Sequence, residues 1–292
     1  MSIDTRDSHT SIPSRPDLLR LGVGIIGIGT SGPLIAMSQM PILTLIAWRN
    51  IGGSLITAPF AIRHRIDREG VKWSMIAGLA LATHFIGFFL AMRMTSVAAG
   101  TALVALQPLF AALFVRQRGG DIPSSVWSGM LISFVGVLLI SGIDLQISTR
   151  AFIGDMAAMI SAALAALYMM LGSHAQRTIE TPVYTTLCYL TCGLISLIAA
   201  LIGGFDLLDF PRREWLLLIA LIAGAQILGH TMFNAALKRV SPAIVSLIVF
   251  FEVPVAALLA AWWMGQLPPL GTIPGIALIL SGCTMIVWRG KR

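Results

Sequence analysis

Charged residues are scarce in this sequence. Asp, Glu, Lys and Arg make up 11% of its 292 residues, whereas 57% of the residues are hydrophobic. A soluble domain carries about 25% charged residues, because its surface must face water. This deficit excludes a water-soluble protein and favours a polytopic membrane protein.

Motifs of catalysis and metal binding are also missing. The chain has no HExxH, GxSxG, P-loop or CxxC pattern, so no motif supports an enzyme, an ATPase or a metal site. Its three cysteines, Cys188, Cys192 and Cys283, all fall within apolar stretches, where free cysteine packs as a small hydrophobe. We therefore expect no enzymatic activity, no disulfide framework, no metal and no cofactor.

Long hydrophobic runs are what the chain has in abundance. Each run is about as long as a helix must be to cross the roughly 30 Å hydrocarbon core of a bilayer. Backbone groups in lipid must be hydrogen-bonded internally, so each run is predicted to be a helix. The first run follows a polar head without a small-x-small cleavage site, so we expect it to stay as a span. The predicted spans cover residues 21–38, 42–62, 73–93, 96–115, 125–142, 152–171, 183–203, 214–236, 241–264 and 270–288.

Positive charges are distributed unevenly between the connections. Ten spans place both termini on one side, and fifteen of the 20 Lys and Arg residues fall there, against four on the other side and Arg49 within a span. By the positive-inside rule, this bias predicts cytoplasmic tails at residues 1–20 and 289–292. The net charge of +7 therefore indicates loops beside the inner leaflet of a bacterial inner membrane rather than nucleic-acid binding.

The second half of the chain is a partial copy of the first. The stretch Ser241–Gly265 aligns with Ser96–Gly120, and the similarity extends to the flanking spans. Five spans per copy is an odd number, so the second copy must enter the membrane upside down. We predict an all-α membrane protein of ten helices in two inverted five-helix repeats, residues 21–145 and 146–288. Such repeats place a transport site at the midplane between them.

Two pairs of aligned polar residues are predicted at midplane depth: His84 with Gln226, and Gln107 with Glu252. Each lies eleven residues from the start of its span, or roughly 16 Å at the rise of an α-helix, and half the hydrocarbon core is about 15 Å. Polar residues beside helix-breaking prolines at matching places in two halves point to a binding site. We expect these four residues to face a common cavity.

Glu252 and Arg49 are ionisable groups predicted within spans. An ionisable group at this depth costs at least about 2.5 kcal/mol on insertion, so Glu252 should face a cavity or a partner. Glu252 either takes up and releases a proton during transport, or bonds backbone groups that Pro254 frees. For Arg49, roughly 10 Å into its span, we favour a side chain that snorkels to the outer interface. The alternative is a charge pair with Glu252 or a bidentate contact with a substrate carboxylate.

Other polar and aromatic residues extend the predicted site. Phe88 follows His84 by one helical turn, and a histidine beside an aromatic ring suits a planar substrate group. Gln226, His230 and Asn234 recur every four residues, and such a polar stripe on a membrane helix must face protein or water. The alternative for each of these polar residues is a hydrogen bond within a packed helix contact.

Two further features belong to the same prediction. Three hydroxyls either line the cavity or bond the helix backbone. They belong to Tyr168 and to the neighbouring pair Thr30 and Ser31. Proline positions within spans are candidate bending points for a conformational change. These are Pro33, Pro108 and Pro254.

The repeat resembles a known family. The stretches SVAAGTALVALQPLF and SPAIVSLIVFFEVPVAALL are similar to the repeat of the drug/metabolite transporter superfamily, and most similar to its ten-helix EamA-type exporters. The similarity covers nearly all of residues 20–290. It implies a secondary transporter that exports small organic metabolites, with amino acids among the commonest substrates of this branch.

The predicted cavity suits amino acids, including aromatic or other apolar ones, because it combines aromatic rings, amides and hydroxyls with few charges. The expected partners are a small-molecule substrate, the lipid bilayer and protons as a coupling ion. We expect the protein to be a monomer or a weak dimer. Within the superfamily, the alternative is a drug or lipid-moiety flippase with a wider cavity. A membrane receptor or an enzyme acting on lipid-borne substrates is a further alternative, although neither needs two-fold pseudosymmetry.

Overall fold

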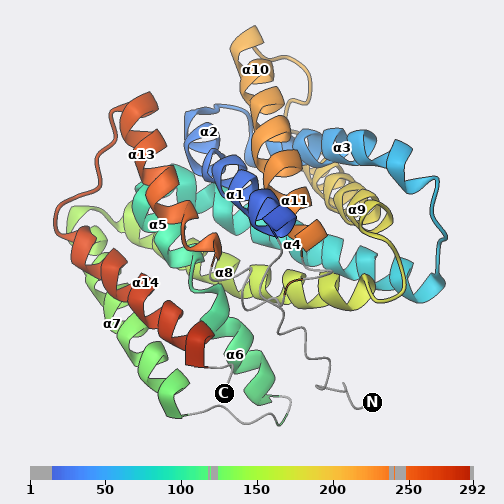
Figure 1. Cartoon of the computed structure of the whole chain (residues 1–292). Helices are drawn as coiled ribbons and strands as arrows, with labels where there is room; N and C mark the ends of the chain where they lie inside the picture. Colours follow the sequence, from blue (N-terminus) through green and yellow to red (C-terminus); the bar gives the residue numbers. More distant parts are fainter. Residues whose placement is uncertain (1–14, 118, 120–123, 237–239, 241–247, 290–292) are drawn as a thin grey trace.

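The computed structural model describes residues 15–117, 119, 124–236, 240 and 248–289, and every regular element in that part is a helix. Figure 1 shows the helices packed into one bundle. They are α1 (Arg15–Gly29), α2 (Ser31–Met37), α3 (Ile42–Ala61), α4 (Arg68–Met94), α5 (Val97–Val104), α6 (Gln107–Gln117), α7 (Ser124–Ile147), α8 (Thr149–Ala175), α9 (Thr181–Ile202), α10 (Arg212–Leu221), η1 (Ile222–Thr231, a π-helix), α11 (Met232–Ala236), α13 (Glu252–Met264) and α14 (Thr272–Arg289).

The apolar helices confirm the prediction of an all-α membrane protein. Within the described residues, six helical stretches are long and apolar enough to cross a membrane, and three shorter apolar helices accompany them. The six are Arg15–Met37, Arg68–Met94, Val97–Gln117, Thr149–Ala175, Thr181–Ile202 and Arg212–Ala236. The shorter ones are Val126–Ile140, Glu252–Met264 and Thr272–Met285.

The N-terminal boundary differs from the predicted one. Helix α1 begins at Arg15, whereas the tail was expected to reach residue 20. Pro16 suits the first turn of a helix because its missing N–H would have no partner there, and the acidic Asp17 in that turn complements the helix dipole. Residues 1–14 and 290–292 of the predicted tails, the start of the ninth span at 241–247 and the basic pair at 238–239 lie outside the described residues.

Three spans are interrupted just before a proline. Helix α1 gives way to α2 at Thr30, three residues before Pro33, and a two-residue turn separates α5 from α6 before Pro108. A turn likewise precedes α13, which contains Pro254. Proline lacks an N–H and clashes with the carbonyl four residues earlier, so the helix breaks at that point.

A fourth span departs from α-helical geometry in another way. Its central ten residues, from Ile222 to Thr231, form the π-helix η1. Here α1 approaches very closely, because a Cβ on Gly27 would lie 2.7 Å from the carbonyl oxygen of Gly224. Glycines thus allow the backbones of α1 and η1 to touch, as small residues do in membrane helix contacts.

Helix pairing is the same when the two halves of the chain are exchanged. Helix α4 of the first half packs on α8, and η1 of the second half packs on α1 at the corresponding place. Three pairs join matching helices directly: α3 with α9, α5 with α13, and α7 with α14, the last visible at the lower left of Figure 1. The pairing is what two duplicated halves related by a pseudo-two-fold axis produce.

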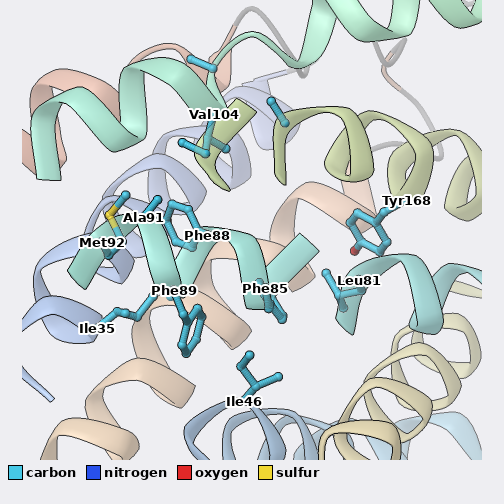
Figure 2. Close-up of a cluster of buried hydrophobic side chains, with 14 of the residues drawn as sticks. Ile35, Ile46, Leu81, Phe85, Phe88, Phe89, Ala91, Met92, Val104 and Tyr168 are labelled. Atoms are coloured by element: carbon cyan, nitrogen blue, oxygen red, sulfur yellow. The ribbon is translucent and has the colours of Figure 1, made fainter. Parts of the chain in front are cut away.

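An aromatic group on α4 lies at the centre of the bundle. Phe85, Phe88 and Phe89 are all buried, and Figure 2 shows them along one helix with Ile46 and Tyr168 among the surrounding side chains. Phe85 and Phe89 approach with ring centroids 5.8 Å apart, within the range of favourable aromatic pairs. This group separates the pocket described next from α3.

Candidate functional site

A pocket with about 600 Å³ of empty volume, counted together with space open to solvent, lies where the interrupted helices meet. Its wall comes from both halves of the chain. The lining residues are Ile28, Ser31, His84, Phe88, Val104, Gln107, Ala165, Tyr168, Met169, His230, Phe233, Asn234, Val249 and Glu252.

Most of the residues predicted from the sequence meet in this wall. They arrive from spans that are distant in the chain, and each of the four spans that depart from regular α geometry contributes. In membrane proteins, irregular backbone is tolerated where it lines a cavity. The predicted residues in the wall are Ser31, His84, Phe88, Gln107, Tyr168, His230, Asn234 and Glu252.

Glu252 and Gln107 occupy matching places in the two halves. Gln107 is the first residue of α6 and Glu252 the first residue of α13, and each is followed closely by a proline. Glu252 is 8% exposed and forms no salt bridge within the described part of the chain. Among the described residues of the pocket wall, it carries the only carboxylate.

His84 is fixed by α8. Its Nδ1 lies 2.9 Å from the carbonyl oxygen of Ser161, and the hydroxyl of Ser161 donates to the carbonyl oxygen of His84 at 3.0 Å. A carbonyl oxygen only accepts, so these bonds are satisfied together when Nδ1 carries the proton. Nε2 is then a hydrogen-bond acceptor. The ring also stacks on Phe88, with centroids 5.9 Å apart and an interplanar angle of 12°.

Tyr168 and Asn234 form a polar pair in the pocket wall. The hydroxyl oxygen of Tyr168 lies 2.8 Å from Nδ2 and 3.0 Å from Oδ1 of Asn234. His230 presents its ring edge-on to Phe85, with centroids 5.4 Å apart. The wall therefore offers neutral hydrogen-bonding groups fixed by neighbouring helices, beside aromatic surface.

Two predicted residues, Gln226 and Thr30, lie outside the pocket wall. Gln226 is fully buried, accepts from Arg49 Nε at 2.7 Å and donates to Asn50 at 3.0 Å. It lies in the π-helix η1, and its bonds to Arg49 and Asn50 hold its side chain against α3, whereas His230 and Asn234 line the pocket. The hydroxyl of Thr30 donates to the carbonyl oxygen of Gly27 at 2.7 Å. It therefore bonds the helix backbone, which was the alternative for this residue.

Arg49 does not snorkel. It is 0% exposed, its guanidinium carbon lies 4.2 Å from the centre of the Phe85 ring, and a second ring, Phe89, lies 5.7 Å away. Such cation–π contacts stabilise a desolvated cation. Two guanidinium nitrogens, NH1 and NH2, have no hydrogen-bond partner within the described residues, and Arg49 and Glu252 form no salt bridge there. Arg49 is a buried positive charge one aromatic ring behind the pocket wall.

Ser161 was missed by sequence reasoning. It lies in an alanine-rich stretch that indicates helix packing, and no periodicity distinguishes it from its neighbours. The apolar lining residues Met169 and Phe233 carry no distinguishing signal either, since the spans are apolar throughout. Among the described residues, no group of three or more His, Cys, Asp or Glu side chains is arranged to hold a metal ion.

One family model matches the chain in two successive stretches, which together cover most of it. The model of the EamA-like transporter family matches residues 18–142 and again residues 152–288. The two matches correspond to the two halves recognised from the repeat, as expected for a duplicated unit.

Full-length relatives and a solved structure agree with this match. An uncharacterized transporter, YxxF, of Bacillus subtilis (strain 168) is 24% identical over 302 residues, covering 99% of this chain and 93% of its own length. A "Probable terminal-alkyne amino-acid exporter" of Streptantibioticus cattleyicolor is 23% identical over 286 residues, covering 92% of this chain and 89% of its own length. One crystal structure shares the fold with a TM-score of 0.67 at 19% identity, covering 96% of this chain and 100% of that chain.

Proposed function

The chain belongs to the EamA-like transporter family and is a multi-pass membrane transporter, and we propose that it exports amino acids with aromatic or other apolar side chains. The observation that carries this proposal is the composition of the pocket. A single carboxylate, that of Glu252, stands among neutral hydrogen-bonding groups and apolar side chains. An amino acid offers a matching set: an ammonium, a carboxylate and an apolar side chain.

The apolar part of the wall suits the side chain of such a substrate. Phe88, Met169 and Phe233 supply aromatic and thioether surface, and a methionine adapts its shape to differing ligands. His84, Gln107 and Asn234 supply polar contacts that orient a ligand. The Streptantibioticus relative, named as a probable amino-acid exporter, supports the same substrate class at low sequence identity.

The mechanism we propose is alternating access. The two halves, residues 21–145 and 146–288, insert with opposite orientations, and both termini face the cytoplasm of a bacterial inner membrane. The helix breaks before the three prolines lie at the pocket, so bending there opens the pocket to one side and closes it to the other. Proton exchange at Glu252 couples this cycle to the proton gradient.

Efflux from proteoliposomes tests the proposal. Vesicles with the full-length protein should release preloaded tritiated L-phenylalanine or L-leucine several-fold faster than empty vesicles. The substitution Ala165→Phe fills the pocket and should abolish this release, because Ala165 lies in the wall. Ile160→Phe on the same helix is the matched control, since Ile160 is 61% exposed and faces lipid. Release no faster than from empty vesicles overturns the proposal, and transport of bulky apolar or lipid-linked compounds instead assigns the flippase.

A further inference from the structure

Two backbone N–H groups at the pocket have no acceptor among the residues that the structure describes. The first turn of any helix has N–H groups without intrahelical partners. In α6, Leu109 and Phe110 donate to the carbonyl oxygen of Leu106, and Pro108 has no N–H, which leaves that of Gln107. The N–H of Gln107 donates no hydrogen bond within the described part of the chain.

The start of α13 repeats this arrangement. Val253 donates to Phe250, Val255 donates to Phe251, and Pro254 has no N–H. The N–H of Glu252 is left without an acceptor among the described residues. The two aligned prolines thus leave one donor at each helix start, and both donors belong to residues that line the pocket.

A third donor at the same pocket is a side chain. Ser31 lines the pocket and is 1% exposed, yet its hydroxyl has no hydrogen-bond partner within the described residues. Neighbouring Thr30 satisfies its hydroxyl on the helix backbone, so Ser31 is the exception in this stretch. A buried hydroxyl without a partner costs free energy, unless a ligand supplies the partner.

We propose that the N–H groups of Gln107 and Glu252, together with the Ser31 hydroxyl, form a subsite for the carboxylate of the substrate, while the Glu252 carboxylate binds its ammonium. This inference rests on the proposed function and deepens it. Helix N-termini carry a positive partial charge and attract anions, so two of them at one pocket favour a carboxylate. An α-amino acid carries its ammonium on the carbon next to the carboxylate. Glu252 offers a matching pair from one residue: a backbone N–H for the carboxylate and a side-chain carboxylate for the ammonium.

The arrangement selects molecules that carry both charges. A carboxylic acid without the ammonium is repelled by the Glu252 carboxylate, and an amine without the carboxylate leaves the three donors unpaired. Nε2 of His84, an acceptor when Nδ1 carries the proton, adds a second acceptor for the ammonium. The substrate class is therefore the free α-amino acid, not its deaminated or decarboxylated form.

Binding measurements with three related probes test this selection. Scintillation-proximity binding of tritiated L-phenylalanine to the purified full-length protein is displaced by unlabelled L-phenylalanine, 3-phenylpropanoate or phenethylamine. The second probe lacks the ammonium and the third lacks the carboxylate. L-Phenylalanine should displace the label at concentrations at least about ten-fold lower than either, since each lost charged hydrogen-bond contact costs that factor or more.

The variant Ser31→Ala assigns the carboxylate to its subsite. It should weaken L-phenylalanine binding about ten-fold and leave phenethylamine binding within about two-fold of wild type, because only the former has a carboxylate for the hydroxyl. Ser196→Ala is the matched control, a buried serine that does not line the pocket, and it should change neither affinity.

The outcomes separate the inference from the proposed function. Equal displacement by phenethylamine and L-phenylalanine, or an equal effect of Ser31→Ala on both, overturns the carboxylate subsite and leaves amine recognition intact. Absence of L-phenylalanine binding, together with absence of amino-acid transport by the wild type, overturns the proposed function and the subsite with it.

Discussion

Glu252 carries the only carboxylate among the described residues of the pocket wall. We expect Glu252→Gln to abolish the pH dependence of transport, since the amide neither binds nor releases a proton. The measurement is the initial rate of amino-acid efflux from proteoliposomes from acidic to alkaline pH, with and without a proton gradient.

The matched variant Glu252→Asp keeps a titratable group and should retain a pH-dependent rate at reduced magnitude. A Glu252→Gln protein whose pH profile equals that of the wild type would assign Glu252 the structural role of bonding backbone near Pro254. The pocket would then have to bind the ammonium through neutral acceptors alone.

The depth of single residues could be predicted, but their direction could not. Counting eleven residues at the helical rise brought His84, Gln107 and Glu252 to one pocket, because a membrane has a fixed thickness. The same count also selected Gln226, whose side chain accepts from Arg49 outside the pocket wall. Snorkelling was expected for Arg49 because a sequence does not reveal the rings of Phe85 and Phe89 that hold its guanidinium.

At the scale of elements, helix breaks were more predictable than helix type. A proline has no N–H to donate to the carbonyl four residues earlier, and Pro33, Pro108 and Pro254 coincide with three interruptions, whereas Pro59 lies inside the continuous helix α3. The π-helix η1 has no such local cause. It accompanies the close glycine contact with α1, a tertiary contact between residues about 200 positions apart that periodicity does not encode.

Helix α4 offers a prediction at this scale through its N-cap. The exposed carboxylate of Asp67 accepts a hydrogen bond from the N–H of Gly70 at 3.0 Å, and this bond lowers the pKa of Asp67 from its usual 3.8. Asp67→Ala should lower the Tm of the detergent-solubilised protein by roughly 1–3 °C at pH 7. Differential scanning fluorimetry measures this change.

The pH dependence of that difference identifies its origin. A carboxylate whose pKa is lower in the folded protein stabilises the fold above pH 3.8, and this contribution is lost as the pH falls through the folded value. The gap in Tm between wild type and Asp67→Ala should therefore narrow below pH 3.8. Asp67→Asn also caps a helix but does not titrate, so its advantage over Asp67→Ala should persist in acid. If the difference in Tm between wild type and Asp67→Ala stays constant down to acidic pH, the assignment of Asp67 as the N-cap is contradicted.

At the scale of the whole molecule, a buried hydrogen-bond network joins elements of the two halves. The connection from α2 to α3 is tied to α10 by Glu214, which accepts from the Ser38 hydroxyl at 2.7 Å and from the Gln39 N–H at 2.8 Å. Arg213 donates to the Glu214 carboxylate at 2.9 Å. All of α5 is buried, and the pocket extends to Phe233, the second residue of α11. In the proposed orientation this network lies at the outward end, and we expect it to keep the pocket closed on that side.

We call the contacts of Glu214 with Ser38, Gln39 and Arg213 the latch, and we expect its loss to shift the population toward the state open to the outside. The network is charge-assisted, so Glu214→Ala should weaken the junction of the α2–α3 connection with α10. Met92 reports the opening, because it is 2% exposed and its side chain reaches the backbone of both Gly32 in α2 and Gly100 in α5. In a Met92→Cys protein without its native cysteines, labelling by a membrane-impermeant maleimide should accelerate several-fold when Glu214→Ala is added.

The matched control is Glu69→Ala at the opposite end of α4. The exposed Glu69 carboxylate accepts a hydrogen bond from the Trp73 ring N–H within the same helix. This change removes a glutamate of the same kind without touching the latch, so Met92→Cys labelling should stay at its starting rate. Equal labelling rates in the Glu214→Ala and Glu69→Ala proteins would mean that the network around Glu214 stabilises the loop in every state. We expect faster labelling with Glu214→Ala alone, and we expect saturating L-phenylalanine, applied from the cytoplasmic side, to reverse it. A ligand shifts an equilibrium only when it binds the two states differently. Such a reversal would therefore show that the latch and the pocket act on the same conformational equilibrium.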